Sequence, residues 1–216
     1  WKHEISYLDM LTLRQRLRAV AQADRHAVDG KYLIRSLYFD TPSDRALREK
    51  LDGVSRRDKF RVRFYNGDTS VIHLEKKSKL GGLGNKQSVP ISATETSALL
   101  QGGLSWMADS GKPLVRELYI KMRTQQLRPR TIVEYTREPY VYPAGNVRVT
   151  LDYDIRIGLS CEDFLNPGIT IPAGDAPIIL EVKWDSFLPS VIRDAIQLEG
   201  RHTSSFSKYA QCRIYG

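Results

Sequence analysis

The seven residues from Lys59 to Tyr65 constrain the fold of this chain more than any other segment. Basic and apolar side chains alternate along them in the order Lys-Phe-Arg-Val-Arg-Phe-Tyr. Successive side chains of a β-strand point to opposite faces of the sheet. The segment therefore predicts a strand with one apolar face and one face that carries Lys59, Arg61 and Arg63. Three positive charges on one face repel one another unless an anion lies against them.

The following segment, residues 70–79, repeats this arrangement. One face is mostly polar and the other is apolar; the first comprises Val71, His73, Glu75, Lys77 and Lys79, and the second Ile72 and Leu74. The sequence Asn66-Gly67-Asp68 between the two segments predicts a hairpin turn. Two such strands indicate a sheet with one packed face and one charged face. If the charged face is concave or closed, it forms a basic tunnel for polyanions.

Two later segments show the same alternation. In residues 146–153 one face carries Arg148, Thr150 and Asp152, and in residues 178–184 one face carries Ile179, Glu181 and Lys183. Taken singly, each strand is explained by an antiparallel sheet with one solvated face. Taken together, the charged faces are dominated by Arg and Lys, with isolated carboxylates. That composition favours an anionic ligand, because arginine binds phosphate bidentately and lysine acts as a point charge.

The isolated carboxylates leave two interpretations open. A lone carboxylate among cations suits a hard divalent metal that bridges to phosphate oxygens. Glu75, Asp152 and Glu181 are of this kind. For Glu181, an ion pair with Lys183 or with a neighbouring arginine is an equal alternative to metal ligation.

The composition of the chain limits which binding partners and which cellular location are expected. The net charge of +8 favours an anionic partner, which could be phosphate, nucleic acid or an acidic membrane. Cys161 and Cys212 are too few for a disulfide framework, so a cytoplasmic location is expected. No run of about 18 apolar residues predicts a transmembrane segment. Trp1 is not an initiator Met, so further residues are expected upstream.

Periodicity and turn signals predict an antiparallel α+β chain with about eight strands. The expected strands are residues 2–5, 32–40, 57–65, 70–79, 86–91, 129–136, 140–142, 146–153 and 177–184. The expected helices are residues 7–23, 44–51, 92–100, 114–126, 190–198 and 207–212. Ser92 followed by Glu95 predicts a capping box. One domain over residues 1–216 is expected, and the strand count is compatible with a barrel.

Motifs along almost the whole chain resemble the bacterial VTC domain. They are Tyr32–Asp40, Glu49–Gly53, Lys59–Arg63, Leu74–Lys77, Asn146–Asp152, Leu180–Lys183 and Ser205–Tyr209. That domain is similar to the catalytic polyphosphate polymerase domain of the yeast vacuolar transporter chaperone complex. Both belong to the triphosphate tunnel metalloenzyme superfamily, which is CYTH-like. The resemblance implies an eight-stranded antiparallel β-barrel with a basic tunnel and flanking helices.

The resemblance also implies an activity and its residues. The yeast enzyme transfers the γ-phosphate of ATP to a growing polyphosphate chain and uses a divalent metal, Mn²⁺ or Mg²⁺. The implied catalytic residues are Arg61, Arg63, Lys77 and Arg148. The implied substrate-binding residues are Lys2, Lys50, Lys59, Lys79, Lys86, Arg137, Lys183 and Lys208. The implied metal ligands are Glu181 and Glu75.

Three alternatives would use the same charged strand faces. If water is the acceptor, the chain is a tripolyphosphatase that releases orthophosphate. If nothing is turned over, it is a polyphosphate- or phosphoprotein-binding module with strongly salt-dependent affinity. A nucleic-acid binder is the weakest alternative, because its cations would lie on an outer surface. The expected partners are therefore ATP, inorganic polyphosphate or triphosphate, and no nucleic acid.

Overall fold

The computed structural model describes residues 1–198, 200 and 206–215. The chain divides into two compact units, and each unit is assembled from three separate stretches of sequence. Unit 1 comprises Trp1–Leu33, Tyr135–Ile155 and Gly174–Ser207, and unit 2 comprises Ile34–Glu134, Arg156–Ala173 and Lys208–Gly216. The single domain over residues 1–216 stays a prediction.

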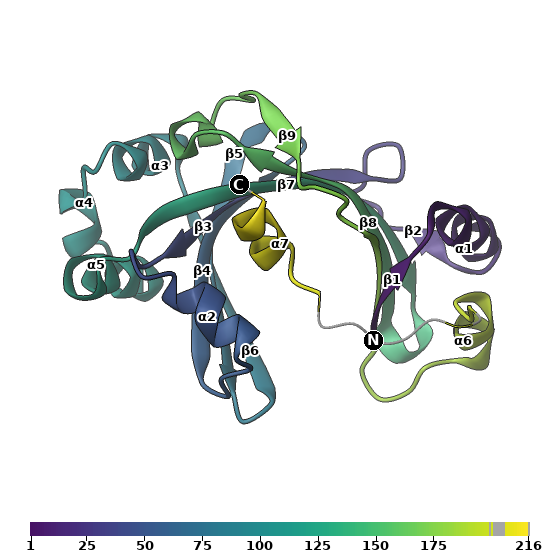
Figure 1. Cartoon of the computed structure of the whole chain (residues 1–216). Helices are drawn as coiled ribbons and strands as arrows, with labels where there is room; N and C mark the ends of the chain where they lie inside the picture. Colours follow the sequence, from purple (N-terminus) through teal and green to yellow (C-terminus); the bar gives the residue numbers. More distant parts are fainter. Residues whose placement is uncertain (199, 201–205, 216) are drawn as a thin grey trace. The chain divides into compact units, whose positions relative to one another are not determined.

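In unit 1, two helices pack on one face of an antiparallel sheet (Figure 1). Its elements are β1 (Lys2–Ile5), α1 (Tyr7–Val20), β2 (Gln22–Ala23), η1 (Ala144–Asn146), β10 (Ile178–Lys183), α6 (Ser190–Ala195) and parts of β7 (Arg128–Tyr142) and β8 (Val147–Gly158). Strand β10 pairs with β1 on one side and with β8 on the other. The core lies between these strands and the apolar side chains of α1 and α6.

In unit 2, α3, α4 and α5 cover one face of a larger antiparallel sheet (Figure 1). Its elements are most of β3 (Tyr32–Asp40), α2 (Arg45–Leu51), β4 (Arg57–Tyr65), β5 (Asp68–Leu80), β6 (Leu83–Ile91), α3 (Ala93–Leu100), α4 (Ser105–Ala108), α5 (Pro113–Gln125), η2 (Cys161–Phe164), β9 (Thr170–Pro172) and α7 (Lys208–Ile214). Strands β3, β4, β5 and β6 are neighbours in this order.

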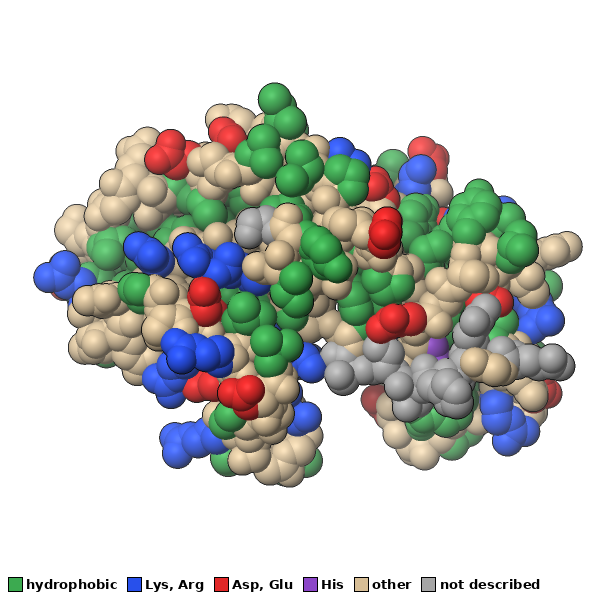
Figure 2. Space-filling model, in the orientation of Figure 1, with side chains coloured by type: hydrophobic (Ala, Val, Ile, Leu, Met, Phe, Trp, Pro, Cys, Tyr) green, Lys and Arg blue, Asp and Glu red, His purple; other side chains and the backbone are tan. Residues whose placement is uncertain are grey.

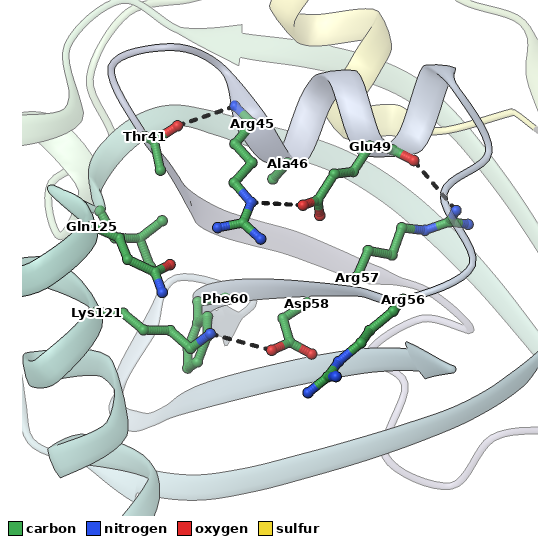
Figure 3. Close-up of a pocket in the computed structure, with 11 residues that line it drawn as sticks. Thr41, Arg45, Ala46, Glu49, Arg56, Arg57, Asp58, Phe60, Lys121 and Gln125 are labelled. Carbon is green, nitrogen blue, oxygen red and sulfur yellow. Dashed lines mark hydrogen bonds and ion pairs between the residues drawn. The ribbon is translucent and has the colours of Figure 1, made fainter. Parts of the chain in front are cut away.

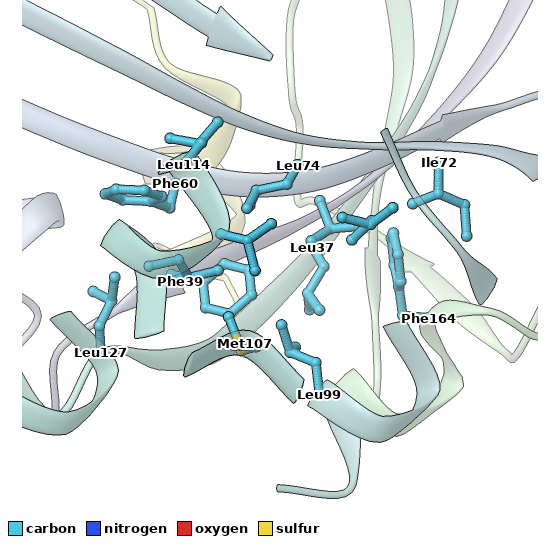
Figure 4. Close-up of a cluster of buried hydrophobic side chains, with 14 of the residues drawn as sticks. Leu37, Phe39, Phe60, Ile72, Leu74, Leu99, Met107, Leu114, Leu127 and Phe164 are labelled. Carbon is cyan, nitrogen blue, oxygen red and sulfur yellow. The ribbon is translucent and has the colours of Figure 1, made fainter. Parts of the chain in front are cut away.

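The core of unit 2 confirms the alternation predicted for β4 and β5. Phe60, Val62 and Phe64 of β4 are buried beside Ile72 and Leu74 of β5. Figure 4 shows side chains of these strands packed against others from the covering helices. Because side chains alternate along a strand, the basic residues of β4 lie on the opposite face, away from α3, α4 and α5.

Local sequence signals explain where several elements begin. Asn66 and Gly67 both have positive φ angles, 53° and 73°, as a tight hairpin between β4 and β5 requires. The predicted capping box of α3 is confirmed. The backbone N–H of Glu95 donates to Ser92 Oγ at 3.0 Å, and the N–H of Ser92 donates to Glu95 Oε2 at 2.7 Å.

The order of paired strands confirms the predicted fold class. Eight strands form the path β1-β10-β8-β7-β3-β4-β5-β6, and β2 and β9 pair with β7 and β8. Where the register is assigned, the pairing is antiparallel. The fold is therefore α+β with an antiparallel sheet. In the described residues β1 and β6 are the ends of the path, so the sheet is not closed into the expected barrel.

Several predicted boundaries are wrong, among them the start of β6, which is Leu83, and the end of α6, which is Ala195. The first helix ends at Val20, because Ala21 is extended and Gln22–Ala23 forms β2 against β7. The strands expected at 129–136 and 140–142 are one strand, β7. Pro139 has no N–H, but its carbonyl accepts the N–H of Asp24 at 3.2 Å, which keeps the proline within the sheet. The strand expected at 146–153 continues to Gly158.

Within the described residues, none of the helices is both long enough and apolar enough to cross a membrane.

Candidate functional site

The register of β4, β5 and β6 places like charges directly opposite one another. Lys59 of β4 is opposite Lys77 of β5, and Lys77 is opposite Lys86 of β6. In the adjacent row, Arg57 is opposite Lys79. Directly opposed residues have Cβ atoms about 4.5–5.5 Å apart, and like charges in such pairs destabilise a sheet. This arrangement therefore indicates a face that holds an anion.

One buried carboxylate lies among these positive charges. Glu75 is 5% exposed. Its Oε2 lies 2.6 Å from both Nε and Nη2 of Arg61, and its Oε1 lies 2.5 Å from Nζ of Lys86. Burial raises the pKa of Glu75, but Arg61, Arg63 and Lys86 outweigh burial and lower the pKa to about 2. Because both oxygens are engaged, Glu75 positions two cations and does not fit the expected role of metal ligand.

The low pKa of Glu75 predicts acid-sensitive stability. A carboxylate whose pKa falls from 4.5 to about 2 on folding stabilises the protein fully above pH 4.5 and loses that effect as the pH falls towards 2. Between pH 5 and pH 3, the drop in the free energy of unfolding should be about 2 kcal/mol smaller in Glu75→Gln than in the wild type. Urea titrations at several pH values measure this difference.

Asp109→Asn is the matched control, because it removes one exposed carboxylate from the same unit. Equal acid sensitivity of Glu75→Gln and the wild type would contradict the ion pairs assigned to Glu75.

Strand β3 supplies polar side chains that hold the two arginines. Arg61 Nη1 donates to Tyr38 Oη at 3.0 Å, and Arg63 Nε donates to Ser36 Oγ at 2.9 Å. Burial raises the pKa of Tyr38, but Arg61 and Arg63 outweigh burial and bring the pKa to about 8. The sequence did not point to Tyr38 or Ser36, because only the register of β3 against β4 makes them neighbours of the arginines.

Helix α7 brings an aromatic side chain to the same face. The ring of Tyr209 lies against that of Tyr38 with centroids 5.1 Å apart, and Lys59 Nζ lies 4.8 Å from the centroid of Tyr209. Burial lowers the pKa of Lys59 to about 8, against the opposing effect of Tyr38. Lys208, the expected C-terminal lysine, directly precedes Tyr209 at the start of α7. The tyrosine was not predicted as a site residue.

Asp40 fixes α2 beside this face. Its carboxylate accepts the backbone N–H groups of Ala46 and Leu47 at 2.8 and 3.1 Å and also bonds the hydroxyl of Tyr209. Lys50 lies in the last turn of α2, and burial, Arg57 and Lys79 lower its pKa. Figure 2 shows Lys and Arg side chains gathered around α2 on this side of unit 2.

Unit 1 contains a second cluster, centred on a buried ion pair. Arg137 donates through Nε and Nη2 to the two oxygens of Asp152 at 2.6 and 2.7 Å, and Asp152 is 0% exposed. Glu181 lies 3.8 Å from Arg137 Nη2 and 3.7 Å from Lys183 Nζ, and it is opposite Lys2 in the register. Burial raises the pKa of Glu181, but the lysines and Arg137 outweigh burial and lower it.

Glu181 fits a hard divalent cation. Its ion contacts at 3.7 and 3.8 Å are longer than hydrogen bonds, so a cation can approach its oxygens. Thr150 is opposite Glu181 in the register, and its buried Oγ1 has no hydrogen-bond partner among the described residues. Oxygen donors of this kind suit Mg²⁺ and Mn²⁺. The described residues contain no group of three His, Cys, Asp or Glu side chains for a metal, so other oxygens must complete the shell.

Arg148 is engaged in a separate ion pair of unit 1. Its Nη2 lies 3.0 Å from Asp24 Oδ2, and its side chain is 45% exposed. Lys2 Nζ donates to the carbonyl of Phe206 at 3.2 Å. The expected site residues therefore form two groups. Those in unit 2 are Lys50, Lys59, Arg61, Arg63, Glu75, Lys77, Lys79, Lys86 and Lys208, and those in unit 1 are Lys2, Arg137, Arg148, Glu181 and Lys183.

The sequence of the chain matches one known protein family. The VTC domain family matches residues 1–215. The chain belongs to the VTC domain family. This confirms the resemblance drawn from the sequence motifs and supports a function connected with polyphosphate or triphosphate. No curated protein sequence matches this VTC domain.

One solved structure shares the fold at low sequence identity. A Bacillus halodurans protein described as a candidate adenylate cyclase is 15% identical, with a TM-score of 0.52 over 84% of this chain and 77% of that protein. Two Pyrococcus horikoshii proteins match with lower TM-scores. PH1819 is 14% identical (TM-score 0.43, 90% and 81% covered), and PH1012 is 13% identical (TM-score 0.45, 90% and 82% covered). The first likeness concerns the fold alone.

Proposed function

We propose that this VTC domain is a metal-dependent polyphosphate polymerase that transfers the γ-phosphate of ATP to a growing polyphosphate chain. The observation that carries the proposal is the row of opposed lysines on β4, β5 and β6, namely Lys59, Lys77 and Lys86. Glu75 is the counter-ion of both Lys86 and Arg61, so this one carboxylate balances less charge than the opposed lysines and Arg61 carry. A chain of phosphates presents one negative charge after another and matches such a row.

The residues around Arg61 support phosphoryl transfer by positioning and charge stabilisation. Glu75, Tyr38 and Ser36 hold Arg61 and Arg63 before any substrate binds. Preorganised cations of this kind stabilise the charge that develops on the transferred phosphoryl group. In the reaction, the bond from the γ-phosphorus to the β–γ bridging oxygen breaks. A bond to a terminal oxygen of the polyphosphate chain forms, and ADP leaves with the electron pair.

The chemistry requires no covalent protein nucleophile. Phosphoryl transfer depends mainly on alignment of the attacking and leaving oxygens and on neutralisation of charge. In unit 1, Glu181 and Thr150 would hold the divalent metal, which would neutralise charge on phosphate oxygens when bound. Arg137, fixed by Asp152, would add a cation that keeps its orientation.

Incubation of the protein with ATP and Mn²⁺ tests the proposal. Gel electrophoresis and ³¹P NMR should show long polyphosphate and ADP as products. Orthophosphate as the sole phosphate product would support a tripolyphosphatase instead. Binding of ATP or polyphosphate without turnover would support a binding module. Either result would overturn the polymerase.

Glu181→Gln serves as the metal control in the same assay. Its amide is a weaker ligand for a hard cation than a carboxylate, so the Mn²⁺ concentration for half-maximal activity should rise about tenfold or more. Asp175→Asn, an exposed position in the same unit, should leave the metal requirement unchanged. An unaltered requirement in Glu181→Gln would place the metal elsewhere.

A further inference from the structure

A cavity of 410 Å³ lies in unit 2 on the helix-covered side of β4. Its wall includes Asp58 and Phe60, which alternate with Lys59 and Arg61 along the strand and so lie on the other face of the sheet. None of the residues expected for polyphosphate binding lines it. Arg57, which lies opposite Lys79 beside the opposed lysines, also lines the cavity, whereas its other cations, Arg45, Arg56 and Lys121, lie outside the charged face.

Positive charge dominates the lining of this cavity. Arg45, Arg56, Arg57 and Lys121 face two carboxylates, Glu49 and Asp58. Figure 3 shows which elements supply these side chains. Arg45 comes from α2, Lys121 from α5 and Arg57 from the first position of β4, and Arg56 directly precedes that strand. The lining carries two more positive than negative charges, so a ligand with two negative charges would balance it.

The hydrogen bonds leave donors available to such a ligand. Arg45 donates through Nε to Glu49 at 2.7 Å, while its two terminal nitrogens have no partner among the described residues. The guanidinium of Arg56 has no hydrogen-bond or ion-pair partner in the part of the chain that the structure describes. Lys121 Nζ lies 3.3 Å from Asp58, which leaves further ammonium protons free to donate. A pocket with unused guanidinium donors favours an anion with several acceptor oxygens.

The shape and the apolar lining narrow the class of ligand. Ala46, Phe60 and Leu127 provide apolar surface next to the cations. A volume of 410 Å³ exceeds what a single inorganic ion fills and lies in the range of small-molecule sites. Three donors from different elements suit a tetrahedral phosphate better than a planar carboxylate, because phosphate presents oxygens in three directions. A phosphate monoester carries nearly two negative charges at neutral pH.

We propose that this cavity is a second anion site, which binds a small phosphate monoester through Arg45, Arg56 and Lys121, independently of the basic face of β4–β6. The phosphate would lie between the three cations, and an organic group would lie against Phe60 and Leu127. The site does not depend on the polymerase activity proposed above. A failure of either proposal leaves the other standing.

Isothermal titration with AMP tests the site in the wild type and in single variants. Arg56→Ala should weaken AMP binding about tenfold or more, because a charge-assisted phosphate contact is lost. Arg123→Ala is the matched control, since Arg123 is an exposed arginine of α5 outside the cavity, and it should change the affinity less than about twofold. Arg61→Ala, on the opposite face of β4, should leave this binding in place.

A parallel titration with inorganic phosphate distinguishes recognition of a phosphate monoester from recognition of free phosphate. Tighter binding of AMP than of phosphate would support the monoester and its contact with the apolar wall, and equal affinities would overturn that contact. The proposal is overturned if Arg56→Ala binds AMP like Arg123→Ala, or if Arg61→Ala abolishes all AMP binding. Because Arg56 is exposed and has no protein partner in the described structure, the thermal unfolding temperature of Arg56→Ala should match that of the wild type.

Discussion

Replacing Arg61 with alanine is expected to lower kcat/KM for ATP by about a hundredfold or more. Two effects act together. The guanidinium that contacts Glu75 and Tyr38 is lost as a phosphate ligand. The carboxylate of Glu75, 5% exposed and no longer neutralised by Arg61, then repels the incoming phosphates. Steady-state kinetics with ATP and polyphosphate primers measure the loss.

A double variant separates these two effects. Arg61→Ala combined with Glu75→Gln removes the guanidinium and also the repelling carboxylate, so it should recover part of the activity lost in Arg61→Ala. Arg128→Ala is the matched control, because Arg128 is an exposed arginine of unit 2 at the start of β7. If Arg61→Ala turned over ATP as Arg128→Ala does, phosphate binding by this face of β4 would be refuted.

Replacing Asp152 with asparagine is expected to lower the free energy of unfolding by about 3–5 kcal/mol. Asp152 is 0% exposed and holds Arg137 through two hydrogen bonds. Asparagine preserves the size of the side chain but removes its charge, which leaves the guanidinium of Arg137 without its close counter-ion. Glu181, at 3.8 Å, compensates only partly. Urea unfolding followed by circular dichroism measures the change.

Asp175→Asn provides the comparison for Asp152→Asn. It also removes one carboxylate from unit 1, but at an exposed position, so its effect should stay within about 0.5 kcal/mol. A loss below about 1 kcal/mol in Asp152→Asn would mean that the ion pair with Arg137 contributes little to the stability of unit 1.

The alternation of side chains made most of the fold predictable. In β4 and β5 a period of two residues separates the buried Phe60, Val62 and Leu74 from the charged face. Burial alone does not follow this period, because Arg63 and Glu75 on the charged face are buried as well. The capping box at Ser92 and the turn at Asn66-Gly67 are equally local signals. The end of the first helix was predicted wrongly because a strand that is distant in the sequence pairs with the residues there. Gln22–Ala23 is extended because it pairs with β7, and the sequence of residues 7–23 does not predict this pairing.

The roles of the carboxylates could not be read from the sequence, because they depend on which side chains face them. Glu75 and Glu181 both follow the same pattern of a lone acid among bases. In the structure both carboxylate oxygens of Glu75 form short ion pairs, with Arg61 and Lys86. Glu181 has only longer ion contacts, and it lies opposite Thr150, whose hydroxyl has no hydrogen-bond partner among the described residues. Only the strand register distinguishes an ion-pair partner from a candidate metal ligand.

The sequence by itself determined the faces of the strands, the excess of positive charge on one of them and the VTC family. These properties are local or additive, since they follow from the order and number of side chains. The tertiary structure decided the opposed lysines Lys59, Lys77 and Lys86, the contact of Tyr209 with Tyr38, and the cavity beside Arg56. Each of these joins residues from different elements. Pairing, packing and burial act between elements, and a linear pattern does not encode which elements meet.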